Sequence, residues 1–255
     1  MENLIKDSLP YITGMGYRKQ CDFYYDEFEK SDYQLYYENC KVFVKTDLLT
    51  EFYLKILSKI NVNIILVTHN SDINITDKFK EIVNSPKIIK WYGQNVNFKH
   101  NKLIPIPIGI ANRRWKHGNV DVITNTLNKK IIKKDNIYCN FSINTNPRER
   151  KKCIENVNLR MENKVNFKDY IKNLSEYQFS ICPEGNGLDT HKVWESLYVK
   201  TIPIVTKSIT FEVFSKQYPI YMIDSWKVFN KKDFNGKLYI DLIKKYENFN
   251  LNISL

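Results

Sequence analysis

Residues 179–205 read Phe-Ser-Ile-Cys-Pro-Glu-Gly-Asn-Gly-Leu-Asp-Thr-His-Lys-Val-Trp-Glu-Ser-Leu-Tyr-Val-Lys-Thr-Ile-Pro-Ile-Val. Short apolar runs bounded by Pro and Gly indicate strands, and two such runs around a helix make a βαβ unit of an α/β fold. Such units bind ligands at the carboxyl end of the first strand, where loop meets helix. This stretch predicts, in order, a buried strand, a glycine loop, a short helix and a second buried strand, over residues 179–182, 183–187, about 190–199 and 202–205.

The predicted loop has the features of an anion site. Gly185 and Gly187, on either side of Asn186, lack a Cβ atom, so backbone N–H groups can approach a ligand closely. The first turn of the helix adds N–H groups and the positive end of the helix dipole. Asp189 or Thr190 can cap that turn, and we favour Asp189. The loop therefore predicts a place for phosphate.

Two charged side chains of the predicted helix fit a nucleotide. Lys192 lies in the first turn beside His191, where the dipole disfavours a cation unless an anion is present. Glu195 lies three residues further on the same side of the helix. A cation for phosphate beside a carboxylate for ribose hydroxyls makes a nucleotide site. A surface Lys–Glu pair next to an ordinary glycine turn explains the same spacing, because Gly-x-Gly is a weak signal.

The run from Cys182 to Leu197, followed by Ile-Pro-Ile-Val, resembles the C-terminal nucleotide-sugar motif of exostosin-like glycosyltransferases. That family shows Pro-x-Gly-x-Gly, a basic residue, a Glu three residues later and a small-residue turn before Ile-Pro-Val. The resemblance is close over 179–205 and looser over 91–118 and 136–150. It implies an α/β protein of GT-B-like architecture, in which two Rossmann-type domains have a cleft between them.

The resemblance also implies residue roles. The nucleotide-binding basic residue of the family falls on Lys192, and its ribose-binding Glu falls on Glu195. The loop after the first strand of the second domain, predicted over 136–143, supplies a basic residue to the diphosphate in GT-B enzymes. Arg148 or Arg150 fits that role, because guanidinium binds phosphate bidentately; the alternative is a charge cluster at a helix start. The full set expected to bind the nucleotide sugar is Arg148, Arg150, Gly185, Asn186, Gly187, Asp189, His191, Lys192 and Glu195.

One position departs from the family pattern. Lys200 stands where the family usually has Gly, directly before Thr201. Gly suits the left-handed turn that ends a helix. Lys at this position predicts either a differently shaped turn or a new contact.

The first half of the chain carries the candidate catalytic base. Residues 41–47 and 62–68 read as buried strands, and the second ends in a polar cluster that contains His69 and Asp72. An inverting transferase needs a carboxylate or imidazole to deprotonate the acceptor hydroxyl, and in GT-B enzymes that base comes from the N-terminal domain. The alternative is an Asn/Ser/Asp turn with a solvated His.

Further elements complete the predicted layout. Residues 103–111 read as an edge or irregular strand because of their two prolines, and 220–224 as a last strand. The segment that follows 103–111 resembles one that lines the cleft in this wider transferase group, which makes Asn112, Arg113 and His117 cleft candidates. Helices are expected over 48–60, 73–84, 119–134 and 169–177, and a third strand over 87–92.

We place the domain division after residue 118. Residues 1–118 form the predicted acceptor-side domain, and 119–255 form the nucleotide-sugar domain. The second of these includes a closing helix, within 231–248, that packs across the domains in GT-B proteins.

Net charge and cysteine content indicate the kinds of partner and the cell compartment to expect. The 255 residues carry a net charge of +11, which nucleic acid, a membrane surface or an anionic small molecule could each explain. The basic residues are scattered, and zinc-finger or RNP-like patterns do not occur, so we expect no nucleic-acid partner. Five widely spaced cysteines without Cys-x-x-Cys, and no signal-peptide or transmembrane pattern, favour a cytoplasmic protein.

The predicted function is transfer of a sugar from a nucleotide-diphosphate donor, most simply a UDP-sugar, to a glycan or glycoprotein acceptor. The sequence contains no Asp-x-Asp, the pair that holds a cation on the diphosphate in metal-dependent enzymes, so we expect no metal and no cofactor. Inversion of stereochemistry follows from the family analogy only. Three alternatives stay open: another nucleotide-dependent transferase or ligase, a basic nucleic-acid-binding module, and a degenerate transferase fold kept for protein interaction.

Overall fold

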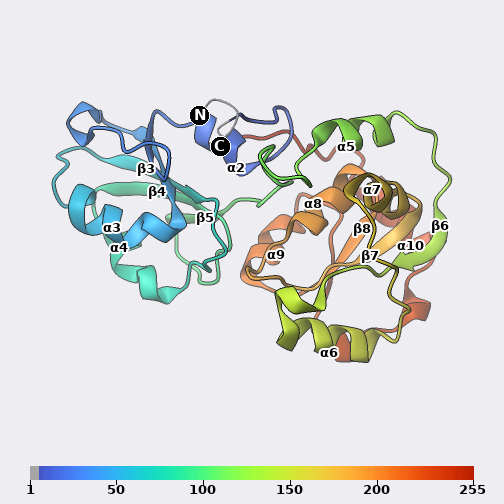
Figure 1. Cartoon of the computed structure of the whole chain (residues 1–255). Helices are drawn as coiled ribbons and strands as arrows, with labels where there is room; N and C mark the ends of the chain where they lie inside the picture. The colour runs from blue at the N-terminus through green and yellow to red at the C-terminus, as the bar shows by residue number, and fades with distance from the viewer. Residues whose placement is uncertain (1–5) are drawn as a thin grey trace. The chain divides into compact units, whose positions relative to one another are not determined.

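The computed structural model describes residues 6–255 and divides the chain into two compact units. Unit 1 comprises Met1–Trp115 together with Asn252–Leu255, and unit 2 comprises Lys116–Leu251. Each unit contains one parallel β-sheet with helices packed on it (Figure 1). The predicted α/β class is thereby confirmed. None of the helices within residues 6–255 is both long enough and apolar enough to cross a membrane.

The sheet of unit 1 has five parallel strands in the order β1-β2-β3-β4-β5. Apolar side chains fill the central strands, where Val42, Phe43 and Leu66 are fully buried. The short strand β5 lies at the edge, as the prolines of 103–111 predict, because Pro cannot donate to a sheet ladder. The strands are β1 (Phe23–Tyr25), β2 (Cys40–Lys45), β3 (Ile64–His69), β4 (Ile88–Gly93) and β5 (Leu103–Pro105).

The helices of unit 1 are shorter than the sequence pattern predicts. The expected helix over 48–60 is an α-helical turn followed by a π-helical turn, and only the second half of the expected helix over 73–84 forms. Helix α2 and strand β1 were not predicted. The elements are α2 (Gly14–Lys19), α3 (Leu49–Phe52), α4 (Lys80–Asn84), the π-turn η3 (Tyr53–Leu57) and the 3-10 turns η1 (Tyr33–Leu35), η2 (Thr46–Leu48) and η4 (Asp77–Phe79).

The sheet of unit 2 has four parallel strands in the order β6-β7-β8-β9. Both sheets therefore run in chain order, without the reversal of the Rossmann order that creates a topological switch point. The carboxyl ends of the strands still share one edge, where the connecting loops gather. The strands are β6 (Lys134–Tyr138), β7 (Tyr177–Ile181), β8 (Ile202–Thr206) and β9 (Tyr221–Ile223).

Helices cover both faces of the sheet in unit 2. Phe179 and Ile181 of β7 face a cluster that includes Cys153 of α6 and Tyr239 of α10. Ser180, between them, faces α8, because side chains alternate along a strand. Figure 1 shows α6 and α7 on different sides of the sheet. The elements are α5 (Val120–Leu127), α6 (Pro147–Val157), α7 (Phe167–Ser175), α8 (His191–Tyr198), α9 (Ile209–Phe214), α10 (Gly236–Lys245) and the 3-10 turns η5 (Ile143–Thr145), η6 (Trp226–Val228) and η7 (Lys231–Asp233).

The division between units differs from the predicted one at both ends. It falls between Trp115 and Lys116, and the last four residues belong to unit 1. Their attachment is local: Ile253 donates its backbone N–H to Pro10 O over 3.1 Å, and Asn252 pairs with Tyr11 in an antiparallel bridge. The predicted closing helix is α10, which packs on the sheet of its own unit.

Candidate functional site in unit 2

The predicted βαβ unit forms as expected, with β7, the glycine loop, α8 and β8 in succession. The N-cap residue of α8 is Thr190, not Asp189. Both oxygens of the Asp189 carboxylate accept from the Trp194 indole N–H, at 2.9 and 2.8 Å. Asp189 is buried in this arrangement, so it fixes the start of the helix against its second turn.

Helix α6 holds the glycine loop in place. Asn146 Nδ2 donates to Gly185 O over 2.8 Å, and Arg150 Nε donates to Glu184 O over 2.9 Å. Arg150 also donates to Ser142 O over 2.6 Å. A Cβ atom on Gly185 would lie 3.2 Å from Arg150 Nη2, which explains glycine at this position. Burial lowers the pKa of Arg150. The guanidinium thus binds loop carbonyls, and the predicted direct role on a diphosphate stays a prediction.

Lys192 is a largely buried cation that has no carboxylate partner within residues 6–255. Its Nζ donates to Asn140 O over 2.6 Å, directly beyond the end of β6. The ammonium also lies 5.2 Å from the ring centre of Tyr138 and 5.9 Å from that of Phe141. No carboxylate oxygen of residues 6–255 forms an ion pair with it. Burial lowers the pKa of Lys192. A buried ammonium with so few partners is costly, and an anion bound beside it would offset that cost.

Glu195 lies one turn further along α8 and is 5% exposed. Its Oε2 accepts from the Tyr170 hydroxyl of α7 over 2.8 Å. Burial raises the pKa of Glu195 to about 7, although the Tyr170 hydrogen bond and the Lys192 charge act in the opposite direction. The structure therefore brings Lys192 and Glu195 together at the carboxyl ends of β6 and β7, as the sequence predicts.

A hydroxyl network fixes the rest of this face of α8. Ser196 Oγ donates to Lys192 O over 2.6 Å, and it lies 2.8 Å from Ser180 Oγ of β7. Thr190 Oγ1 is buried and has no hydrogen-bond partner within the described residues. A Cβ atom on Gly185 would lie 3.3 Å from the Thr190 methyl carbon, so this hydroxyl-bearing side chain adjoins the glycine loop.

The remaining predicted residues of unit 2 are on α6, in the glycine loop and at the start of α8. Arg148 has an 84% exposed side chain whose nearest carboxylate is that of Glu149, at 3.6 Å. Asn186 is exposed at the tip of the loop, and Gly187 O accepts the Gly185 N–H over 3.1 Å. His191 begins α8, and its ring centre lies 6.1 Å from that of His117.

In unit 1, the two candidate bases differ in environment. His69 ends β3 and is 2% exposed. Its Nδ1 accepts the Asn70 N–H over 2.7 Å, which makes Nε2 the donor to Pro107 O at 3.0 Å. Both ring nitrogens thus bind backbone groups, and this geometry gives His69 a structural role. Asp72 is exposed in the loop that follows.

The two predicted cleft residues of unit 1, Asn112 and Arg113, also differ in burial. Asn112 is buried, and its Oδ1 accepts the Met15 N–H of α2 over 2.9 Å. Its Nδ2 donates to Asn70 Oδ1 over 3.0 Å, so Asn112 joins α2 to the loop after β3. Arg113 is exposed. Gly14 is needed at this junction, since a Cβ atom there would lie 1.8 Å from Asn70 Oδ1.

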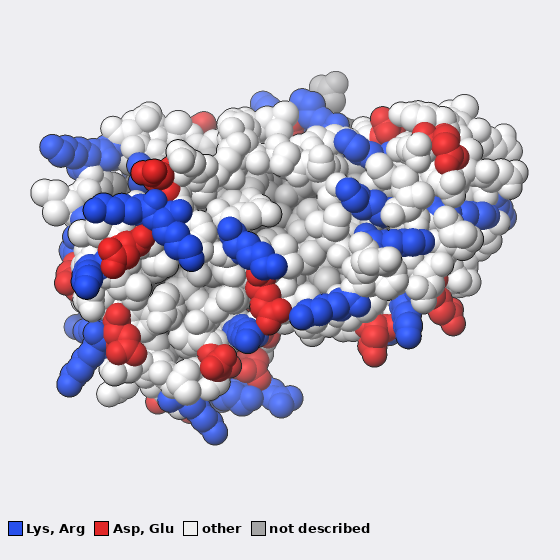
Figure 2. All heavy atoms as spheres, turned by 180° about the vertical axis from the view of Figure 1, so that it is seen from behind, with Lys and Arg blue, Asp and Glu red and all other residues white. Residues whose placement is uncertain are grey.

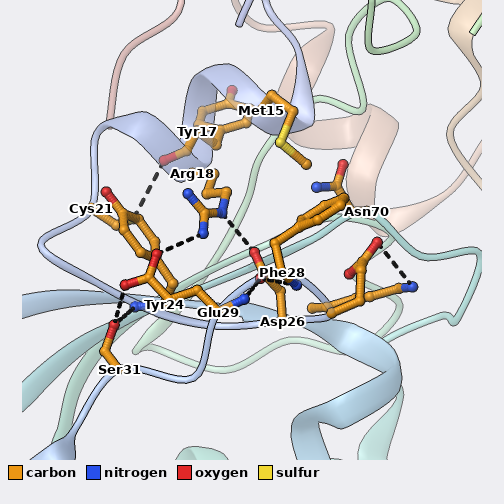
Figure 3. Close-up of polar contacts among 12 residues, drawn as sticks. Met15, Tyr17, Arg18, Cys21, Tyr24, Asp26, Phe28, Glu29, Ser31 and Asn70 are labelled. Atoms are coloured by element: carbon orange, nitrogen blue, oxygen red, sulfur yellow. Dashed lines mark hydrogen bonds and ion pairs between the residues drawn. The ribbon is translucent and has the colours of Figure 1, made fainter. Parts of the chain in front are cut away.

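A buried ion pair lies beside that junction and was not predicted. Arg18 of α2 donates through Nε to Asp26 Oδ2 over 2.7 Å, and its Nη2 lies 3.1 Å from Glu29 Oε2 (Figure 3). The guanidinium carbon stands 3.7 Å from the centre of the Tyr24 ring. Asp26 Oδ1 accepts the N–H groups of Phe28 and Glu29, both at 2.9 Å. With its oxygens so occupied, Asp26 organises the turn after β1.

The turn at Lys200 keeps the left-handed shape that the family glycine would favour. Lys200 has φ 58°, its N–H bonds Leu197 O over 3.0 Å, and the Thr201 N–H bonds Ser196 O over 2.8 Å. These two bonds define a Schellman motif at the end of α8. The expectation of a differently shaped turn is therefore wrong. Lys200 O accepts from the Tyr239 hydroxyl over 2.9 Å, a contact of the backbone that does not depend on the lysine side chain.

Comparison with models of known protein families gave no match, and comparison with curated proteins gave none either. Within residues 6–255, His, Cys, Asp and Glu side chains do not gather in threes that could hold a metal ion. The resemblance to exostosin-like glycosyltransferases accordingly rests on the sequence alone, closely over 179–205 and more loosely over 91–118 and 136–150.

Proposed function

We propose that unit 2 binds a nucleotide-diphosphate sugar, most simply a UDP-sugar, through Lys192 and Glu195. The observation that carries this proposal is the largely buried Lys192 ammonium, which lacks a carboxylate partner among the described residues and lies against Asn140 O, directly after β6. A diphosphate would supply the missing negative charge. The Thr190 hydroxyl and the N-terminal end of α8 offer further donors to the same oxygens.

Glu195 supplies the second half of the site. A ribose carries adjacent hydroxyls that donate to a carboxylate, and Glu195 is the acidic side chain that neighbours Lys192 on α8. Burial raises the pKa of Glu195 to about 7, so the carboxylate and its protonated form both occur near neutral pH. The buried setting strengthens a hydrogen bond between that carboxylate and a ribose, because the local dielectric is low.

The reaction that follows from such a donor is glycosyl transfer. An acceptor hydroxyl of a glycan or glycoprotein attacks the anomeric carbon, and the nucleoside diphosphate leaves with the bonding electron pair. Lys192 and the α8 N-terminus stabilise the charge that develops on the leaving diphosphate, without need of a metal. The GT-B architecture and inversion at the anomeric carbon belong to this proposal. Asp72 stays the candidate general base, since the His69 ring nitrogens bind backbone groups.

The test is calorimetric titration of the whole protein with UDP, GDP and GMP in the presence of EDTA. We expect saturable binding of one nucleoside diphosphate, and a loss of at least tenfold in affinity in Glu195→Ala and in Lys192→Met. Glu155→Ala and Lys151→Met change exposed residues of α6 and serve as matched controls.

Two results would refute the site. The first is nucleotide affinity that is unchanged in both site variants. The second is no nucleotide binding together with salt-dependent binding of RNA or DNA, which would favour a nucleic-acid-binding module. On the face shown in Figure 2, carboxylates are interspersed among the Lys and Arg side chains, which does not favour that alternative.

A further inference from the structure

The loop between α5 and β6 reverses the usual placement of lysine and isoleucine. It reads Lys129-Lys130-Ile131-Ile132-Lys133-Lys134. Ile132 is 88% exposed, whereas Lys133 extends into the protein. Lysine is rarely buried and isoleucine is among the residues most often buried, so this pattern needs an explanation.

Lys133 anchors the loop firmly. Its Nζ donates to Ser175 O over 2.8 Å and to Val199 O over 2.9 Å, at the carboxyl ends of α7 and α8. It also bonds Tyr177 O and Thr201 Oγ1, so four acceptors share the N–H groups of one ammonium. A cation at two helix carboxyl ends is favoured by both helix dipoles. Because Lys133 is held inward, its neighbour Ile132 is held outward.

The surface around Ile132 is positively charged. A groove of about 320 Å³ is lined by Lys129, Lys130, Lys134 and Lys172, together with Glu176. Lys134 pairs with Glu176 over 2.8 Å. Carboxylates of the described residues form no ion pair with the other three lysines. We call this groove with the exposed Ile132 the lysine–isoleucine surface.

We propose that the lysine–isoleucine surface docks unit 2 on a membrane surface that carries anionic headgroups. Lysines near such a surface are attracted to lipid phosphates and carboxylates, and an apolar side chain inserts between the headgroups. The exposed Ile132 favours a membrane over the other anionic partners that the lysines could bind. A free phosphate or an RNA backbone would use the lysines but would gain nothing from an exposed isoleucine, and the groove lacks aromatic side chains for stacking bases.

The test is co-flotation of the full chain with vesicles of phosphatidylcholine, alone or mixed with phosphatidylserine. We expect binding to the mixed vesicles only, and weaker binding as salt is raised. Ile132→Ser should weaken vesicle binding about tenfold. Replacing Lys129, Lys130 and Lys172 together by Ser should weaken it about a hundredfold, since each lysine contributes about fivefold. Leu54→Ser, at a leucine that is 65% exposed in unit 1, is the matched control and should leave binding unchanged.

Three results would overturn the proposal: no binding to mixed vesicles, equal binding by the wild type and Ile132→Ser, or binding of single-stranded RNA that competes fully with vesicles and is unaffected by Ile132→Ser. Melting temperatures of all variants should match that of the wild type, because the substituted side chains are exposed. Comparing the binding of the wild-type protein to the two vesicle compositions tests docking on anionic membranes even if a variant fails to fold.

Discussion

The Tyr170 hydroxyl of α7 donates to Glu195 Oε2 of α8 over 2.8 Å and thereby stabilises the ionised form of a buried carboxyl group. Burial raises the pKa of Glu195 to about 7, and this hydrogen bond opposes the rise. Tyr170 is thus a positioning residue in the proposed donor site: it orients the carboxylate and keeps part of it charged at neutral pH.

Tyr170→Phe should weaken UDP binding about tenfold at neutral pH, because the pKa of Glu195 then rises further and fewer molecules carry the carboxylate. Affinity should return toward the wild-type value as the pH is raised to about 9, where the carboxyl group ionises in the variant as well. Calorimetric titrations across this range measure the effect. Tyr177→Phe is the control, since that hydroxyl contacts Glu162 instead. Equal affinity of Tyr170→Phe and wild type at neutral pH would contradict the role given to Tyr170.

The raised pKa of Glu195 also predicts how stability depends on pH. The folded protein binds a proton at this carboxyl group up to pH about 7, whereas the unfolded chain releases it near 4.5. The native state therefore holds more protons in that window, and the free energy of unfolding falls as pH rises through it, by about 3 kcal/mol for this group. Glu195→Gln removes this contribution. Urea unfolding at several pH values should show a shallower decline in the variant than in the wild type.

Glu155→Gln, at an exposed position, is the control and should follow the wild-type curve. Parallel curves for Glu195→Gln and wild type would show that the carboxyl group titrates normally.

Lys200→Gly should stabilise the protein by about 1 kcal/mol, because a residue with a side chain is disfavoured at φ 58° and glycine is not. The melting temperature should rise by about 2–4 °C for a chain of this size. Asn158→Gly, at φ 47° after α6, is a matched comparison with a smaller expected gain, because Asn tolerates the left-handed region. A lower melting temperature for Lys200→Gly would mean that the Lys200 side chain contributes more than its backbone conformation costs.

Arg18→Met should destabilise unit 1 by about 3–5 kcal/mol, because it leaves the buried Asp26 carboxylate without its cation. Adding Asp26→Asn should restore part of this loss, since the amide oxygen can still accept the N–H groups of the turn while the buried charge is gone. Lys19→Met is the control: in its ion pair with Asp7 the lysine is 62% exposed, so the pair should be worth about 1 kcal/mol or less. Chemical unfolding of the single and double variants measures these differences. A double variant less stable than Arg18→Met would contradict the charge argument.

The sequence was sufficient to locate the βαβ unit and to place Lys192 and Glu195 on the same side of α8, because both depend on neighbours along the chain. Apolar runs between Pro and Gly define β7 and β8, and residues three apart on α8 share a face. The edge position of β5 was likewise predicted by the two prolines of 103–111.

Contacts between distant residues could not be read in this way. Tyr170 reaches Glu195 from another helix, and Arg150 binds loop carbonyls that only the folded chain brings within reach. From the sequence, a helix start at Arg148 and Arg150 is only the alternative to a phosphate role, although Asn146 and Pro147 are ordinary helix-start signals for α6. Strand β1 is too short, and too rich in tyrosine, to show a period.

The most direct test of the account is a crystal structure of the protein with UDP bound in the presence of EDTA. We expect the diphosphate beside Lys192 Nζ and the Thr190 hydroxyl, and the ribose hydroxyls within hydrogen-bond distance, about 2.6–3.2 Å, of the Glu195 carboxylate. UDP bound elsewhere in unit 2, or a protein that takes up no UDP at saturating concentrations, would contradict the assignment of this cluster as a nucleotide-sugar site.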